Sequence, residues 1–294
     1  MEFKEKLKAN PFIYSGIKKI RKFQFSYYPY LQTTFVFNMK KYFRIFGIDR
    51  KNPYKRLKKI KDKHKGERCF IIATGPSLTI EDLEKLKDEI TIGMNSICLA
   101  FDETDWRPTY YGIQDENVYA RLRGQIESLD VECKFISHTI LERLNIAVTN
   151  NDYIFPMDML NHHIENHKYN TRFSNNAFAV VYNGYTVTYS LIQIAVYMGF
   201  KEIYLIGTDC NYSNDMKHHF KEYGHVDPTY LSAGEMMISA YKVAKKYADR
   251  NNIKIYNATR GGMLEVFERV NLDDLLKESG SEQPFTSAGV TTLL

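Results

Sequence analysis

The chain has 294 residues, of which 44% are hydrophobic and 26% are charged. This balance is typical of a soluble globular protein, and the length allows one large domain or one domain with an appendage. The four cysteines form no CxxC pair, which argues against a zinc site or a disulfide framework. Because the sequence shows neither a secretory signal nor a run of 18 apolar residues, we expect a cytoplasmic protein without a transmembrane helix.

The charge is distributed unevenly along the chain. Residues 1–65 hold 19 Lys or Arg and 4 Asp or Glu, a balance of +15, whereas the whole chain is only +5 and residues 66–294 sum to −10. Aromatic residues are interleaved with the basic ones, and two or three helices broken near Pro11, Pro29 and Pro53 are predicted. We interpret residues 1–65 as a basic, aromatic, helical extension, in which the run from Lys55 to Lys65 is a linker or an exposed helix end.

Two functions suit this extension equally. It can dock on an anionic membrane, because basic residues attract the headgroups and aromatic rings suit the interface. It can also pack on the main domain as a solvated helical extension. Nucleic-acid binding is a weaker alternative, since no recognised nucleic-acid-binding signature accompanies the charge, and we expect no nucleic-acid partner.

Short apolar segments alternate with segments of helical periodicity from residue 67 onward. Predicted strands cover residues 68–73, 90–94, 109–113, 134–137, 201–206 and 253–256, and predicted helices cover residues 79–86, 185–199, 233–250 and 263–269. This alternation predicts an α/β domain over residues 66–275, with a mostly parallel sheet and helices on both faces. Residues 276–294 are predicted as a flexible tail, and the polar stretch 161–176, with His162, His163 and His167, as an insertion that covers an acceptor.

In such sheets, ligands bind beyond the carboxyl ends of the strands, which selects the turns to inspect. The first is Thr74-Gly75-Pro76-Ser77, between a predicted strand and a predicted helix. Gly75 lets the backbone approach a ligand closely, the Ser77 hydroxyl can donate a hydrogen bond, and the following helix N-terminus offers N–H groups to a phosphate. An ordinary strand-to-helix turn explains the same residues, and Thr79 is a plausible cap of that helix.

Two further turns carry polar side chains. Asn95 and Ser96 follow the second predicted strand, where Asn95 can read a base edge or a sugar hydroxyl, or form a local turn or helix cap. Gln114 and Asp115 follow the third. Asp115 can accept from ribose hydroxyls or hold a cation, and it can equally serve as a helix cap.

The turn after the strand at 201–206 starts with Gly207 and carries Asp209, which is placed to orient a catalytic loop or to bind Mg²⁺. Beyond it lie Tyr212 and the cluster Lys217, His218, His219 and His225. A neutral histidine is a natural general base for a hydroxyl nucleophile, while Lys217, His218 or Tyr212 can stabilise a departing phosphate. We predict no metal site here, because neighbouring histidines rarely share a metal and no HExxH motif is present.

At this point the sequence resembles a known family. The turn at residues 75–78, the pair Asn95-Ser96 and the block AVYMGFKEIYLIGTD at residues 195–209 are similar to the MptE-like domain, which includes 6-hydroxymethylpterin diphosphokinases and proteins of bacterial surface-glycan loci. The same landmarks resemble small bacterial sialyltransferases that use a CMP-sugar donor. The resemblance spans about residues 67–270 and implies a Rossmann-like fold, a variant of the GT-A type.

The sialyltransferase-like pattern implies roles for individual residues. Gly75, Pro76 and Ser77 would form the turn under the nucleotide, and His225 would be the base that deprotonates the acceptor hydroxyl. Asn95 and Thr186 would contact the nucleotide, whereas Asp115 stands where those enzymes have an Asn. Tyr212 is shifted by one residue from a phosphate-binding Tyr, and Lys217 or His218 stands where a second Tyr is expected.

Taken together, we expect a glycosyltransferase of surface-glycan synthesis. It would move a sialic acid-like or Kdo-like sugar from a nucleotide donor, CMP-linked, to a glycan or glycolipid hydroxyl on the inner face of the membrane, without a required metal cofactor. A Mg²⁺-dependent diphosphokinase that uses ATP is the first alternative, with Asp115 and Asp209 as metal ligands. A non-catalytic nucleotide-binding or scaffold domain is the second. Homo-oligomer formation stays open.

Overall fold

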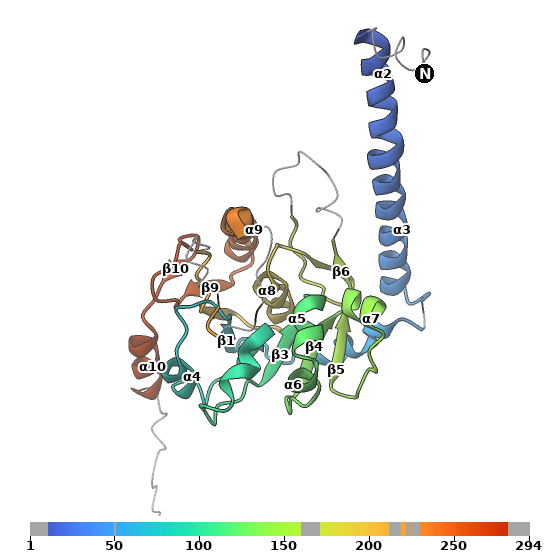
Figure 1. The fold of residues 1–294 in the computed structure, drawn as a ribbon. Coiled ribbons are helices and arrows are strands. Elements are labelled where there is room, and N and C mark those ends of the chain that lie inside the picture. Colours follow the sequence, from blue (N-terminus) through green and yellow to red (C-terminus); the bar gives the residue numbers. More distant parts are fainter. Residues whose placement is uncertain are drawn as a thin grey trace, which may run out of the picture.

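The structure is a computed structural model that describes residues 11–49, 51–159, 171–211, 219–221, 224 and 230–281. Eight strands form one sheet, and every neighbouring pair in it is parallel (Figure 1). They are β1 (Arg68–Ile72), β2 (Thr91–Met94), β3 (Tyr110–Ile113), β4 (Cys133–Ser137), β5 (Asp152–Phe155), β8 (Glu202–Ile206), β9 (Lys254–Asn257) and β10 (Glu268–Arg269). A separate parallel pair joins β6 (Met157–Asp158) to β7 (Val181–Tyr182).

The order of the strands has one reversal. Across the sheet the order is β10-β9-β8-β1-β2-β3-β4-β5. The chain therefore builds outward from β1 to β5 and then returns to the other side of β1, where it adds β8, β9 and β10. The reversal lies between β1 and β8, whose residues pair from Arg68 with Glu202 to Ile72 with Ile206. In doubly wound sheets this position opens a crevice beyond the strand ends.

Both faces of the sheet are buried, which explains the nearly continuous apolar strands. In β1, Cys69 and Ile71 pack into the core on one face, and Phe70 and Ile72 into the core on the other. The first core is covered by α8 (Val187–Met198) and α9 (Tyr230–Arg250). The second is covered by α4 (Ile80–Glu84), α5 (Glu116–Arg121), α6 (Arg123–Glu127), α7 (His138–Leu144) and α10 (Leu272–Ser281). This arrangement confirms the predicted Rossmann-like α/β fold with helices on both faces.

A long helix stands away from this body at the start of the described chain (Figure 1). It consists of α2 (Pro11–Lys22), a π-helical turn η1 (Phe23–Tyr27) and α3 (Tyr28–Ile45). The prediction of a helical extension is confirmed, although the helix is not broken at Pro29, which lies just after the π-helical turn. Among the described residues no helix has the length and apolar character needed to cross a membrane.

The segment after this helix belongs to the body. The 3₁₀ helix η2 (Pro53–Ile60) places Leu57 and Ile60 in the first core, fully or almost fully buried. The His64 imidazole is buried as well, with Nε2 at 2.7 Å from the Tyr110 hydroxyl. The prediction of a linker or exposed helix end over residues 55–65 is therefore wrong. The lysines between these positions dominate the composition, but two apolar side chains three residues apart are enough to seat the segment on the sheet.

The C-terminal part also differs from expectation. Residues 263–269 are not the predicted short helix, because the chain makes turns there and ends in the edge strand β10. Arg269 donates hydrogen bonds to the carbonyl oxygens of Thr259, Gly261 and Gly262, so the segment folds around its guanidinium. Helix α10 then extends to Ser281, past the predicted domain boundary at residue 275. The sequence interpretation also missed β5, a short strand between polar turns.

Candidate functional site

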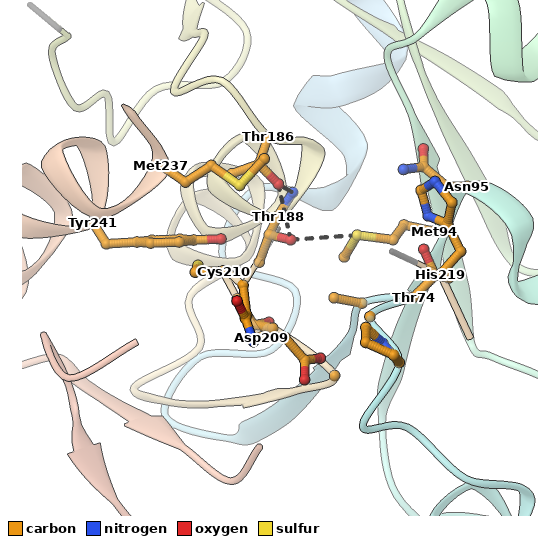
Figure 2. A pocket seen from close by; sticks show the side chains of 16 residues that line it. Thr74, Met94, Asn95, Thr186, Thr188, Asp209, Cys210, His219, Met237 and Tyr241 are labelled. Carbon is orange, nitrogen blue, oxygen red and sulfur yellow. Dashed lines mark hydrogen bonds between the residues drawn. The ribbon is translucent and has the colours of Figure 1, made fainter. Parts of the chain in front are cut away.

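A pocket opens at the reversal of the strand order. It lies beyond the carboxyl ends of β1, β2 and β8 and is lined by Ala73, Thr74, Gly75, Pro76, Met94, Asn95, Thr186, Thr188, Gly207, Thr208, Asp209, Cys210, Asn211, His219, Met237 and Tyr241 (Figure 2). Seven of the residues predicted to bind ligand or act in catalysis thus line one pocket: Thr74, Gly75, Pro76, Asn95, Thr186, Gly207 and Asp209.

Two glycines allow the turns after β1 and β8 to meet. A Cβ on Gly75 would stand 2.1 Å from Asp209 Oδ2 and 2.5 Å from the Gly207 carbonyl oxygen. Gly207 has φ +66°, and a Cβ there would stand 2.6 Å from the Ala73 carbonyl oxygen. The Gly75 N–H donates to that Gly207 oxygen at 2.9 Å. Glycine at both positions is therefore a steric requirement of the pocket floor.

Asp209 is a buried carboxylate at this floor, with 8% of the residue exposed. Its Oδ2 accepts a hydrogen bond from the Ser77 hydroxyl at 2.8 Å and lies 3.4 Å from the Ser77 N–H. Burial raises the pKa of Asp209, and the Ser77 bonds offset part of this effect. Ser77 does not line the pocket itself but holds the carboxylate that does. A desolvated carboxylate in a pocket is a group that can take up a proton or face a cation.

Asn95 lines the pocket and carries an acceptor without a hydrogen-bond partner. It follows β2 with φ +47°, a backbone conformation that asparagine tolerates better than most residues. Its backbone carbonyl accepts from the Tyr111 hydroxyl at 2.7 Å, while its buried Oδ1 has no hydrogen-bond partner. The hydroxyl of the neighbouring Ser96 is also buried and unpartnered, but Ser96 is not part of the pocket lining. An unsatisfied carboxamide oxygen in a pocket is suited to accept from an amine or hydroxyl of a ligand.

The N-terminus of α8 forms the opposite wall. Thr186 caps this helix, because its hydroxyl oxygen accepts from the Thr188 N–H, and both side chains line the pocket. The Thr188 hydroxyl lies 3.4 Å from Met94 Sδ, which joins α8 to the end of β2 (Figure 2). The first turn of a helix carries partial positive charge, so this wall favours an anionic group.

Backbone strain is concentrated around the pocket. Six described residues other than glycine have positive φ, and four of them are Asn or Asp. The other two, Tyr185 at +67° and Cys210 at +51°, adjoin Thr186 and Asp209. A left-handed Tyr or Cys costs conformational energy and is found where the surrounding structure enforces it, often at functional sites. Burial also raises the pKa of the Cys210 thiol to about 12, so this cysteine is an uncharged wall residue.

The first predicted anion site is occupied by the protein itself. We expected the N-terminus of α4 to offer N–H groups to a phosphate. Instead, Thr79 and Asp82 form a capping box, with each side chain bonded to the other residue's backbone N–H, and Arg260 forms an ion pair with Asp82. The carboxylate of Asp82 already neutralises this helix end. The cap predicted at Thr79 is confirmed.

Two predicted residues face away from the pocket. Asp115 caps α5, because its Oδ1 accepts from the N–H groups of Asn117 and Val118 at 2.7 and 3.2 Å. Gln114 Oε1 accepts from the Ser190 hydroxyl at 2.6 Å and so links β3 to α8. Neither residue is part of the pocket lining. For Asp115, the helix-cap alternative is the one that the structure supports.

The loop after β8 carries the other predicted catalytic residues. Tyr212, Lys217, His218 and His225 lie outside the described residues, as do His162, His163 and His167. Of the histidines in this loop, His219 is described and lines the pocket. The next residue, Phe220, donates its N–H to the Thr74 carbonyl oxygen at 2.8 Å, which ties the loop to the first turn. His219 belonged to the cluster read from the sequence but had received no role of its own.

Sequence reasoning missed several residues of the pocket lining. Met237 and Tyr241 come from α9, and Thr188 and Met94 lie one or two residues from predicted positions. Met237 and Tyr241 fall in the helix predicted over residues 233–250, but only the packing of α9 shows that they reach the pocket. Gly234 permits it, since a Cβ there would stand 2.6 Å from the Cys210 carbonyl oxygen. Within the described part of the chain, no three His, Cys, Asp or Glu residues are grouped as metal ligands.

Comparison with known families identifies the domain. The family described as 6-hydroxymethylpterin diphosphokinase MptE-like matches residues 48–215, more than half of the chain. The chain belongs to the MptE-like family. The matched range starts before η2, which agrees with the place of η2 in the core, and it ends after the Asp209 turn. The MptE-like part thus supplies β1 to β8 and most of the pocket, while His219, Met237 and Tyr241 come from beyond it.

Other comparisons are weak. A solved structure titled as the MAf glycosyltransferase from Magnetospirillum magneticum AMB-1 is similar to 74% of this chain with 15% identity and a TM-score of 0.48. The chain spans 37% of the length of that protein. No curated protein matches the sequence.

Proposed function

We propose that this protein is a glycosyltransferase that moves a sugar from a nucleotide donor, CMP-linked, to a glycan hydroxyl. The observation that carries the proposal is the place of the pocket, at the reversal between β1 and β8, where doubly wound sheets bind nucleotides. Membership of the MptE-like family supports a substrate with phosphate groups. The resemblance of the strand-end turns to CMP-sugar enzymes supports the donor.

The pocket walls suggest how such a donor would lie. The phosphate would face the N-terminus of α8 at Thr186 and Thr188, where helix charge favours an anion. The base would face Asn95, whose Oδ1 is free to accept from an exocyclic amine such as that of cytosine. Gly75 and Gly207 would keep side chains away from the nucleotide between them.

The transfer of the sugar requires a general base and a stabilised leaving group. The acceptor oxygen would form a bond to the anomeric carbon and lose its proton to the base, while the bond from that carbon to the donor phosphate breaks and CMP leaves with the electron pair. His225 is the proposed base by resemblance, and Lys217, His218 or Tyr212 would balance the phosphate charge. Asp209 would orient the loop that follows it.

A ligand panel tests the donor. We expect CMP without metal to raise the thermal unfolding midpoint of the full chain more than CDP, UDP, GDP or ATP, because a ligand that binds only the folded state stabilises it. The family description favours one second function, a diphosphokinase acting on a pterin. A shift with ATP only in the presence of Mg²⁺, together with ATP consumption when a pterin is added, would select that function. A panel without any shift would overturn both.

A matched pair of variants tests the proposed contact between Asn95 and the nucleobase. Asn95→Ala should weaken CMP binding by roughly 5- to 150-fold, since one buried hydrogen bond of about 1–3 kcal/mol is lost. Asn145→Ala is the control, because Asn145 is also left-handed, at φ +44°, but lies at the end of α7, outside the pocket lining. Equal CMP binding by both variants would reject the contact.

The general base is tested separately. His225→Ala should lower turnover about 10²- to 10⁴-fold, and a variant with near-normal turnover would reject that assignment.

A further inference from the structure

The long N-terminal helix carries an exposed apolar stripe. The stripe consists of side chains spaced by three or four residues within α2 and again from α3 to its C-cap: Ile17, Ile20, Tyr28, Leu31, Phe35, Met39, Tyr42 and Phe46. Ile20, Phe35 and Phe46 are 66%, 65% and 73% exposed. Apolar surface of this extent on one face indicates an interaction site.

The π-helical turn η1 (Phe23–Tyr27) separates the two parts of the stripe. From Ile17 to Phe35 the interval is 18 residues, which is five complete turns of an α-helix. An uninterrupted α-helix would therefore place both parts on one face. The wider π turn rotates the chain less per residue, so it offsets the α3 part from the α2 part around the helix axis. Each part of the helix still presents an exposed apolar side.

The contact with the body fixes the direction of the stripe. Arg44 is buried, donates from Nη2 to the Ala179 carbonyl oxygen at 2.6 Å and lies over the Tyr54 ring at 4.9 Å. On a helix with about 100° per residue, Arg44 is on the face opposite Tyr42 and Phe46. The anchored side of α3 faces the body, so the apolar side of α3 faces away from it.

The charges of the helix decide which partner fits. Residues 11–45 contain seven Lys or Arg and no Asp or Glu. In α2 these cations (Lys18, Lys19, Arg21 and Lys22) lie beside and opposite the stripe. Two copies of such a helix would bring only positive charges together, without the opposite charges that stabilise helix pairs. An anionic membrane surface offers both an apolar layer for the stripe and negative headgroups for the flanking cations.

We propose that the N-terminal helix, residues 11–46, lies in the surface of an anionic lipid bilayer and anchors the MptE-like domain there. Membrane attachment and glycosyl transfer are independent, because loss of nucleotide binding would leave vesicle binding intact. Attachment would nevertheless bring the pocket close to a lipid-linked acceptor.

Co-sedimentation of the full chain with vesicles tests the proposal. We expect binding to vesicles of equal parts phosphatidylcholine and phosphatidylglycerol, and weak binding to phosphatidylcholine alone. Added salt should weaken the binding, because it screens charges over about 10 Å at 0.1 M. Lys18→Gln with Lys22→Gln should lower the partition coefficient about fivefold for each cation removed. Lys242→Gln with Lys245→Gln, on the exposed part of α9, removes the same charge from the body and should leave the partition unchanged.

Neutral variants test the apolar stripe. Ile20→Ser with Phe35→Ser should lower the partition at least tenfold, whereas Val148→Ser with Met263→Ser, which alters exposed apolar residues on the body, should not. Circular dichroism and the unfolding midpoint of each variant check that the fold is kept. Equal binding to neutral and anionic vesicles, or a stripe variant that binds as the parent does, would overturn the proposal. So would a dimer, measured by light scattering, that the stripe variant converts to monomer while vesicle binding persists.

Discussion

Individual residues at the pocket floor combine two requirements, close backbone approach and a buried carboxylate. The Gly75 position has no room for a side chain, because Asp209 and Gly207 fill the space that a Cβ needs. The carboxylate in turn stands in an environment that disfavours its charge. Residues that lower stability in this way are expected where function depends on them.

Replacement of Gly75 tests the steric requirement. Gly75→Ala should destabilise the protein by about 1–3 kcal/mol, since the turns after β1 and β8 must separate, and it should also abolish the nucleotide-induced thermal shift. Gly124→Ala is the control. Gly124 lies in α6 with open space around it, so alanine there should be neutral or stabilising by up to about 1 kcal/mol. Thermal unfolding measures both, and an unchanged midpoint for Gly75→Ala would contradict the geometry.

The raised pKa of Asp209 has a stability consequence with a definite sign. A carboxyl whose pKa is higher in the folded than in the unfolded state binds its proton more tightly when folded, so it lowers stability as pH rises above the unfolded value near 3.8. Asp209→Asn removes this titration. We expect its unfolding midpoint to exceed that of the parent by a few degrees at neutral pH, with the difference vanishing below pH 3.8.

The same Asp209 variant should lose turnover, because the carboxylate is part of the proposed machinery. Asp249→Asn provides the comparison, since Asp249 is exposed on α9 and pairs with Lys245. It should change the midpoint little at any pH. A less stable Asp209→Asn at neutral pH would show that the Ser77 hydrogen bonds outweigh the burial of the charge.

Helix α4, which follows the Gly75 turn, is fixed by interactions at its N-terminus. Helix α4 has only five residues, too short to be stable by itself, and its start is fixed by the Thr79–Asp82 capping box and by Arg260. Arg260 comes from the turn after β9, so the cap also links the segments that follow β1 and β9. The pKa of Arg260 is raised by its hydrogen bonds to Asp82. The turn between β1 and α4, which carries Gly75, therefore depends on a cap outside the pocket.

Removal of the cap measures this dependence. Thr79→Ala should cost about 1 kcal/mol of unfolding free energy, the usual value for an N-cap. Thr33→Ala, at an exposed position of α3, should cost much less. Denaturant titration gives both values. If Thr79→Ala leaves the free energy unchanged, the ion pair of Arg260 with Asp82 alone holds the helix start.

At the scale of the whole molecule, the boundary between helix and body lies earlier than the composition suggests. The basic region of residues 1–65 divides into a helix outside the body and a segment, η2 to His64, inside its core.

Two truncated chains test this boundary by their thermal unfolding midpoints. A chain that begins at Lys41 keeps Arg44, Leu57, Ile60 and His64, so it should unfold at the parent's midpoint. A chain that begins at Glu67 lacks these four residues, so it should unfold at a clearly lower temperature or fail to fold. Equal midpoints for these two chains would place the boundary back at residue 65.

The sequence by itself determined the fold class, the strand-end turns and the family. These follow from local patterns, namely apolar runs of strand length, helical spacing and glycines at turns, so β1, α8 and the Gly75 and Asp209 turns were predictable. The predicted linker at residues 55–65 was wrong because two apolar residues among many lysines, Leu57 and Ile60, pack into the core. The predicted helix at residues 263–269 was wrong because the Arg269 side chain holds the preceding loop by hydrogen bonds to its carbonyl oxygens.

Only the tertiary structure decided which turns meet. The order of strands cannot be read from the chain, because parallel strands pair across long crossovers. The reversal between β1 and β8 brings Gly75 to Asp209 and leaves Asp115 outside the pocket as a helix cap.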